Sequence, residues 1–134
     1  MIPRVENLVL DSEGLSAWLL GRDREVNAML EEFDVQGTEF VVGANTIVEV
    51  AHARVNEPKL HWILSRVVVE PVTERSARAA ARLLKDAGLH GHKYAIDATV
   101  AEMALRQRAP VAMLTSDVDD MAKLCGKRVK LIRV

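Results

Sequence analysis

Four acidic residues stand in apolar stretches of the sequence, where a carboxylate is costly to bury. Asp11 and Asp117 each follow a short apolar run, while Glu49 and Asp97 lie inside mostly apolar stretches with helical spacing. A buried carboxylate needs compensation by a basic partner, a raised pKa or a metal ion. Carboxylates that converge without an arginine cluster repel one another. A hard divalent cation relieves that repulsion, and oxygen ligands suit Mg²⁺ or Mn²⁺.

Two of these acids also have a structural interpretation as helix caps. Asp11 directly precedes a helical pattern that opens at Ser12, as an N-cap residue does. Glu49 lies three residues after Thr46, which is the spacing of a capping box. For either residue alone, the capping interpretation stays open.

The other two acids leave structural alternatives as well. Asp117, with Asp119 and Asp120 close behind it, occupies an expected helix N-terminus, where the helix dipole stabilises acids. Asp97 follows Lys93 by one helical turn, a spacing that allows an ion pair. Asp97 is the hardest of the four to explain by structure alone, because the expected helix around it is apolar on most sides.

Strands and helices alternate along the chain, and their order positions the acids. Short β-branched runs bounded by turn residues predict buried strands at 8–10, 40–42, 67–69, 111–114 and 129–134. Helical patterns span 12–20, 22–33, 46–55, 60–65, 73–87, 94–108 and 117–124. Strands separated by helices predict a parallel sheet with helices on both faces. Ligands bind beyond the carboxyl ends of such strands, so we expect Asp11 and Asp117 to face one crevice.

Length and composition predict one globular domain spanning residues 1–134. The chain is 49% hydrophobic and 28% charged, which excludes wholesale disorder. Cys125 is the only cysteine, so a disulfide scaffold and a four-cysteine zinc site are excluded. No apolar run is long enough to cross a membrane, and the first residues lack a signal-peptide pattern, so we expect a cytoplasmic protein. The net charge of −1 argues against gripping nucleic acid by bulk electrostatics alone.

The four acids and their neighbours resemble a known family. The matching stretches are Leu8-Val9-Leu10-Asp11-Ser12, Thr46-Ile47-Val48-Glu49-Val50, Ala95-Ile96-Asp97-Ala98 and Leu114-Thr115-Ser116-Asp117-Val118-Asp119-Asp120. In this order and spacing they are similar to the PIN-domain family, and more narrowly to the VapC-type toxins of bacterial toxin–antitoxin pairs. The resemblance covers essentially the whole chain. One departure is Glu13-Gly14, where the family carries small hydroxyl or apolar residues.

The resemblance implies a PIN-like fold, a three-layer α/β/α sandwich with a central parallel sheet, and an acidic pocket that holds Mg²⁺ or Mn²⁺. The residues that match the family's four catalytic acids are Asp11, Glu49, Asp97 and Asp117. By the same resemblance Asp11, Asp97 and Asp117 bind the ion, and Glu49 positions a ligand water or acts as base. Asp120 matches an accessory acid, and Ser12, Thr115 and Ser116 fall where the family carries hydroxyl groups beside the metal.

The activity implied by the resemblance is that of an endoribonuclease toxin, in which a metal-activated water hydrolyses an RNA phosphodiester bond. The expected protein partner is an antitoxin, which docks on the apolar helices that carry Trp18 and Met29, and the chain is expected to form a homodimer. Three alternatives stay open: a catalytically silent PIN-fold binding module, a nuclease outside toxin–antitoxin systems, and a nuclease that acts on DNA. Receiver domains and haloacid-dehalogenase-like phosphatases do not fit Ser12-Glu13 directly after Asp11.

Basic residues and histidines supply weaker candidates for contacts with a substrate. Arg22, Arg24 and Arg54 lie nearest the predicted mouth of the crevice. His52 is about one helical turn beyond Glu49, which is a place to line the pocket. The basic stripe over 75–85 is more typical of a solvated helix face, and the pair His90 and His92 is more typical of a loop.

Overall fold

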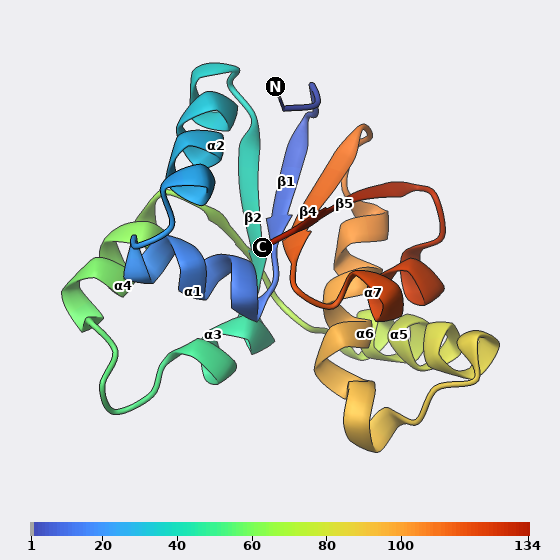
Figure 1. Ribbon diagram of the computed structural model, residues 1–134. Coiled ribbons are helices and arrows are strands. Elements are labelled where there is room, and N and C mark those ends of the chain that lie inside the picture. Colours follow the sequence, from blue (N-terminus) through green and yellow to red (C-terminus); the bar gives the residue numbers. More distant parts are fainter. Residues whose placement is uncertain (1) are drawn as a thin grey trace.

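A five-stranded sheet, parallel throughout, forms the centre of the computed structural model, which describes residues 2–134. In spatial order the strands are β3 (Val68–Glu70), β2 (Glu39–Gly43), β1 (Asn7–Leu10), β4 (Val111–Thr115) and β5 (Val129–Arg133). All five expected strands are present within a few residues of their predicted positions. Since every strand points the same way, all the carboxyl ends meet at one edge of the sheet (Figure 1).

Seven helices cover the two faces and the carboxyl edge of the sheet. They are α1 (Ser12–Leu20), α2 (Arg24–Val35), α3 (Ala44–Val50), α4 (Glu57–Ser65), α5 (Glu74–Ala87), α6 (Gly91–Arg106) and α7 (Val118–Cys125). One apolar core joins the sheet to α1, α2 and α4, and a second joins it to α5, α6 and α7. The fold is therefore the expected α/β/α sandwich.

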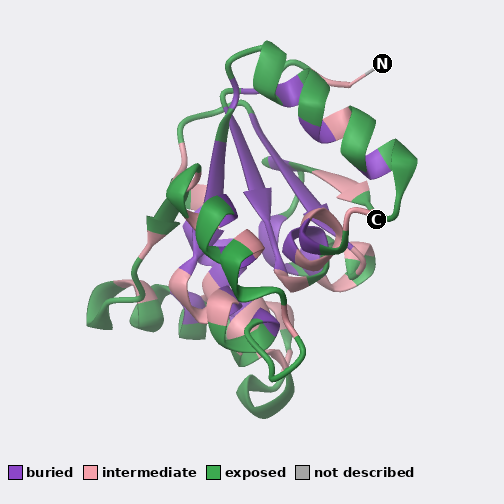
Figure 2. Ribbon diagram, turned by 90° about the vertical axis from the view of Figure 1, so that its left-hand side faces the viewer, coloured by how far each residue is buried: buried purple, intermediate pink, exposed green. Residues whose placement is uncertain are grey.

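Successive side chains along the central strands point to opposite faces of the sheet and so contribute to both apolar cores. On β1, Leu8 and Leu10 belong to the core under α1, α2 and α4, while Val9 belongs to the core under α5, α6 and α7. A strand buried on both faces is continuously apolar, which is the pattern that identified these runs in the sequence. Figure 2 shows the buried central strands between helices whose outer faces are exposed.

Several helix boundaries differ from the sequence prediction, and side-chain caps explain where α2 and α4 begin. The helix predicted over 46–55 is α3, which begins at Ala44 and ends at Val50. The chain then forms a loop until the side chain of Asn56 caps α4 by accepting from the N–H of Lys59 at 3.1 Å. Likewise α2 starts at Arg24 rather than at Arg22, because Asp23 caps it with its side chain.

One glycine fixes how closely α1 approaches the sheet. A Cβ atom on Gly14 would lie 2.8 Å from the carbonyl oxygen of Leu114 and 2.9 Å from its Cβ. No side chain larger than hydrogen fits this backbone contact without movement. The first turn of α1 is thereby held directly against the carboxyl end of β4, which brings Asp11 beside Thr115.

Within residues 2–134, no helix combines the length and the apolar character that a membrane crossing requires.

Candidate active site

Asp11 lies at the carboxyl end of β1 and is almost completely buried, with 3% of its surface exposed. Its side chain caps α1 by accepting a hydrogen bond from the N–H of Gly14 at 2.9 Å, so the capping prediction is confirmed. Burial nevertheless raises the pKa of Asp11 from 3.8 to about 6. The Thr115 hydroxyl and the Gly14 N–H oppose this rise, while the charges of Asp117 and Glu13 add to it. The cap alone therefore does not compensate the charge.

Thr115 links Asp11 to the next acid along the sheet. Its side chain is fully buried at the end of β4, and its hydroxyl oxygen accepts from the backbone N–H of Asp117 at 3.0 Å. Asp117 takes the N-cap position of α7, but its carboxylate makes no capping hydrogen bond. The expected position of Asp117 at a helix N-terminus is confirmed, and because its carboxylate makes no capping hydrogen bond, its oxygens remain available to the pocket.

Glu49 lies on α3 and is the third of the four acids. Burial raises its pKa, the neighbouring Ser12 hydroxyl lowers it, and the charges of Glu13 and Asp117 raise it further. The capping box expected from the spacing of Thr46 and Glu49 is absent. The helix α3 begins at Ala44, and its N-cap position is Gly43, which makes no side-chain capping hydrogen bond. Thr46 consequently lies in the first turn rather than at the cap position, and its buried hydroxyl has no hydrogen-bond partner.

Asp97 completes the set from α6. Burial raises its pKa from 3.8 to about 6, and the charges of Asp117, Asp11, Glu49 and Asp120 add to this rise. The alternative pairing with Lys93 does not form among the described residues, because the ammonium of Lys93 instead lies 5.2 Å from the ring centre of Tyr94.

A break in α6 separates Lys93 from Asp97. Tyr94 leaves helical geometry, with φ −113° and ψ 16°. The regular part of α6 thus starts just before Asp97, and Lys93 lies on the other side of the break.

The structure thus brings together all four acids that the sequence singled out, from the end of β1, from α3, from α6 and from the loop after β4. None of the four is in an ion pair shorter than 4.0 Å within residues 2–134. The accessory acid Asp120 differs, because Lys123 lies 3.8 Å from it. Ser116 offers its carbonyl rather than its hydroxyl, as the acceptor for a guanidinium N–H of Arg133 at 3.1 Å.

The donor chemistry of this cluster suits a hard divalent cation, because every candidate ligand is a carboxylate or hydroxyl oxygen. Burial, with added repulsion from neighbouring acids, raises the pKa of Asp11 and of Asp97, and such a cation would lower both values. In the described part of the chain, no three His, Cys, Asp or Glu side chains stand close enough together to hold an ion in this geometry. His90 and His92 contribute no such group either.

Arg133 is a cation on the same edge of the sheet as the acids, and the sequence did not single it out. Arg133 ends β5 and pairs in register with Thr115, so it stands one strand away from the cluster. The sequence feature that could have identified Arg133 is its position at the end of the last predicted strand, which lies on the same edge of the sheet as Asp117. Arg22 and Arg24 instead follow the far end of α1, which is about 13 Å long.

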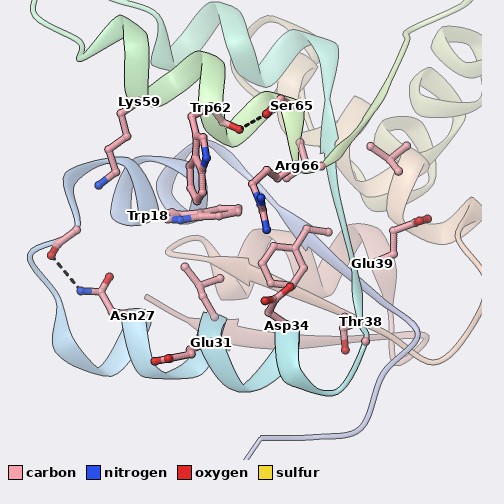
Figure 3. A pocket seen from close by; sticks show the side chains of 16 residues that line it. Trp18, Asn27, Glu31, Asp34, Thr38, Glu39, Lys59, Trp62, Ser65 and Arg66 are labelled. Atoms are coloured by element: carbon pink, nitrogen blue, oxygen red, sulfur yellow. Dashed lines mark hydrogen bonds between the residues drawn. The ribbon is translucent and has the colours of Figure 1, made fainter.

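A large groove lies apart from the acids, on the α1, α2 and α4 side of the sheet. Its volume is about 840 Å³. Figure 3 shows Trp62 of α4 above Trp18 of α1, with ring centres 6.4 Å apart, and Phe40 packs edge-on against Trp18 at 5.4 Å. Glu31 and Asp34 line one wall.

The opposite wall of this groove carries positive charge. Lys59 and Arg66 project from α4, and the guanidinium of Arg66 lies 5.1 Å from the ring centre of Trp62. Trp62 remains 51% exposed. The groove thus combines aromatic rings with two walls of opposite charge. It involves α1 and α2, where the sequence predicted a docking surface, and also α4.

Comparison with known proteins supports the fold. No family model matches the sequence, and no curated protein matches it significantly. Among solved structures, the chain is similar to a chain in the crystal structure of VapBC2 from Rickettsia felis bound to a DNA fragment from their promoter. The match covers 96% of this chain and 98% of that chain, with a TM-score of 0.71 and 14% sequence identity. The PIN-like fold that the resemblance implied is confirmed.

Proposed function

We propose that this chain is a metal-dependent endoribonuclease that acts as the toxin of a toxin–antitoxin pair. The observation that carries the proposal is the meeting of four acids at the carboxyl edge of the sheet, none of them in an ion pair shorter than 4.0 Å within residues 2–134. The fold shared with a chain of the VapBC2 complex supports it. The carboxyl edge of a parallel sheet is also the usual place for a ligand site in open α/β folds.

The reaction is hydrolysis of a phosphodiester bond. Mg²⁺ or Mn²⁺, when bound, would lower the pKa of a ligand water and neutralise charge on the scissile phosphate. Asp11, Asp97 and Asp117 would hold the ion. Glu49 accepts a hydrogen bond and then the proton from the attacking water, a role that suits its raised pKa.

Hydrolysis gives one product with a 5′-phosphate and one with a 3′ hydroxyl. The water oxygen forms a new bond to phosphorus, the bond from phosphorus to the 3′ oxygen breaks, and that oxygen takes a proton to become a 3′ hydroxyl. Arg133 has guanidinium N–H groups beyond the one that binds Ser116, and its pairing in register with Thr115 would make these groups available to the phosphate at this edge of the sheet. The ends of three neighbouring strands thus supply acids, a hydroxyl and a cation to one reaction.

The partner in this proposal is an antitoxin segment that lies in the 840 Å³ groove. An amphipathic helix would place apolar side chains against Trp18 and Trp62 and charged side chains against the walls of opposite charge. The groove and the acids are separate surfaces, so binding in the groove does not itself require the acids. A partner long enough to extend along α1 would reach the acids and block them.

The decisive test is cleavage of total RNA by the purified protein with Mg²⁺ or with EDTA. Cleavage is expected with Mg²⁺ alone and is expected to be lost in Asp97→Asn, while the exposed control Asp86→Asn cleaves like the parent. Calorimetric titration of Mg²⁺ provides a readout independent of activity, with binding to the parent and none to Asp97→Asn. If the parent binds no Mg²⁺ and cuts no RNA but still binds a partner in the groove, the chain is a silent binding module and the nuclease proposal is wrong.

A further inference from the structure

A smaller hollow lies between α1 and the loop that follows α3. Its volume is about 270 Å³. It begins at Ser16, which is one helical turn, or about 6 Å, beyond Ser12 on α1. Ser12 is the residue whose hydroxyl affects the pKa of Glu49. The hollow therefore starts about one helical turn along α1 from the residues that surround the acids, between the packed elements α1 and α3.

The lining of this hollow is apolar on its walls and rich in donors at its mouth. Leu19, Leu20 and Val50 form the walls, and Leu20 is 60% exposed although it is a large apolar side chain. A single flat ring, that of His52, stands at the mouth with Arg54 beside it. The walls suit the faces of an aromatic ligand, and the mouth suits its polar edge.

One hydrogen bond fixes the chemistry of His52. Its Nδ1 accepts from the backbone N–H of Arg54 at 3.1 Å. Because Nδ1 accepts, the ring hydrogen lies on Nε2, which becomes a donor on a residue that lines the hollow. The guanidinium of Arg54 is in no ion pair within the residues that the structure describes. Nε2–H of His52 and the guanidinium of Arg54 can therefore donate hydrogen bonds to a ligand.

We propose that this hollow binds one unpaired base of the RNA, the base next to the cleaved phosphate, and that it sets the sequence preference of the enzyme. This inference rests on the proposed ribonuclease function. Unpaired bases are recognised by stacking on histidine rings or arginine planes and by hydrogen bonds along their edges. The volume lies just below the ~300–1,000 Å³ of pockets that hold drug-sized ligands, which suits one base and not two.

The donors at the mouth select the base. Nε2–H of His52 and the guanidinium N–H groups of Arg54 require acceptors on the ligand. Guanine offers two adjacent acceptors, O6 and N7, which an arginine binds in bidentate fashion. The hollow therefore favours guanine over bases whose exposed edge mixes donors and acceptors.

The test maps cleavage sites in a randomised single-stranded RNA pool by sequencing the product ends. The parent is expected to enrich guanine at one position adjacent to the cut. His52→Ala and Arg54→Ala are expected to lower kcat/KM for guanine-containing sites about tenfold and to remove that preference, since each stacked base contributes substantially to binding. His52→Phe keeps a stacking ring without the donor, so it is expected to restore rate but not base identity. His61→Ala, an exposed histidine on α4 outside the hollow, is the matched control.

The outcomes separate this inference from the proposed function. If the parent cleaves RNA and His52→Ala and Arg54→Ala keep the same base preference, the subsite is wrong and the nuclease stands. If the parent cleaves nothing, fluorescence anisotropy of labelled pentanucleotide RNAs with guanine or adenine at the central position tests the hollow directly. Tighter binding of the guanine RNA, lost in Arg54→Ala, would keep the subsite while the nuclease proposal fails. Equal binding of both RNAs would overturn the subsite as well.

Discussion

Replacing Asp11 by asparagine should make the metal-free protein more stable while it removes activity. The pKa of Asp11 rises from 3.8 to about 6 because the carboxylate is buried. Each unit of pKa shift corresponds to about 1.36 kcal/mol, so ionised Asp11 costs the fold about 3 kcal/mol. Asparagine has the same shape without the charge, and it caps helices as well as aspartate does. Its Oδ1 can still accept from the N–H of Gly14, so we expect a gain of about 1–3 kcal/mol at pH 7.5.

The pH dependence of this gain follows from the direction of the shift. The folded pKa lies above the unfolded value, so the native state holds the proton more tightly than the unfolded state does. Stability from this group is fully present below about pH 4 and is lost as the pH rises through about 6. The difference between Asp11→Asn and the parent should therefore be large at pH 7.5 and nearly absent at pH 4.

Urea unfolding in EDTA at the two pH values measures both free energies. Asp86→Asn on the exposed side of α5 is the control, with an expected change within about 0.5 kcal/mol. Adding Mg²⁺ at pH 7.5 should stabilise the parent and leave Asp11→Asn unchanged, because the ion binds the native acids only. A variant that is less stable than the parent at pH 7.5, or equally shifted at both pH values, would refute this account of the cost of burial.

Three further perturbations follow from the same structure. Thr46→Val should raise the free energy of unfolding by about 1 kcal/mol in urea titrations, because the buried Thr46 hydroxyl has no partner; a loss of stability would show that the hydroxyl is satisfied. Gly14→Ala should lower it by about 1–3 kcal/mol, because the new Cβ would meet the backbone of Leu114 at 2.8 Å; an unchanged unfolding midpoint would contradict this. Arg133→Ala should raise KM for RNA and reduce the slope of log affinity against log salt by about 1, with kcat nearly unchanged; an unchanged slope would remove Arg133 from the phosphate path.

The sequence was sufficient to predict the strands and the convergence of the acids, because both depend on patterns that local chemistry imposes. A strand buried on both faces must be apolar throughout, and acids at strand ends of a parallel sheet must share an edge. For Asp11, the interpretation as a helix cap and the interpretation as a member of an acidic pocket are both correct. It caps α1 as its spacing indicated, and it is also buried among like charges.

Other features depend on contacts that spacing does not encode. Thr46 and Glu49 have the spacing of a capping box, yet the helix starts two residues earlier, so the box cannot form. The break at Tyr94 similarly removes a pairing of Lys93 with Asp97 that an unbroken helix would allow. Arg133 reaches the site only through the pairing of β5 with β4, which is a long-range contact. Helix starts, kinks and strand neighbours therefore decide what the same residues do.

The net charge of −1 describes the whole chain but not its site. At the carboxyl edge of the sheet, four acids stand without an ion pair shorter than 4.0 Å among residues 2–134, and two of them have a pKa raised to about 6. At neutral pH Asp11 and Asp97 are mostly ionised, so the fold carries the cost of burying their charges and the repulsion from neighbouring acids. A divalent ion bound among the acids, as proposed, would offset this cost and would take its affinity from the same charges. The proposed activity and the cost of burying the acids would then have one physical origin.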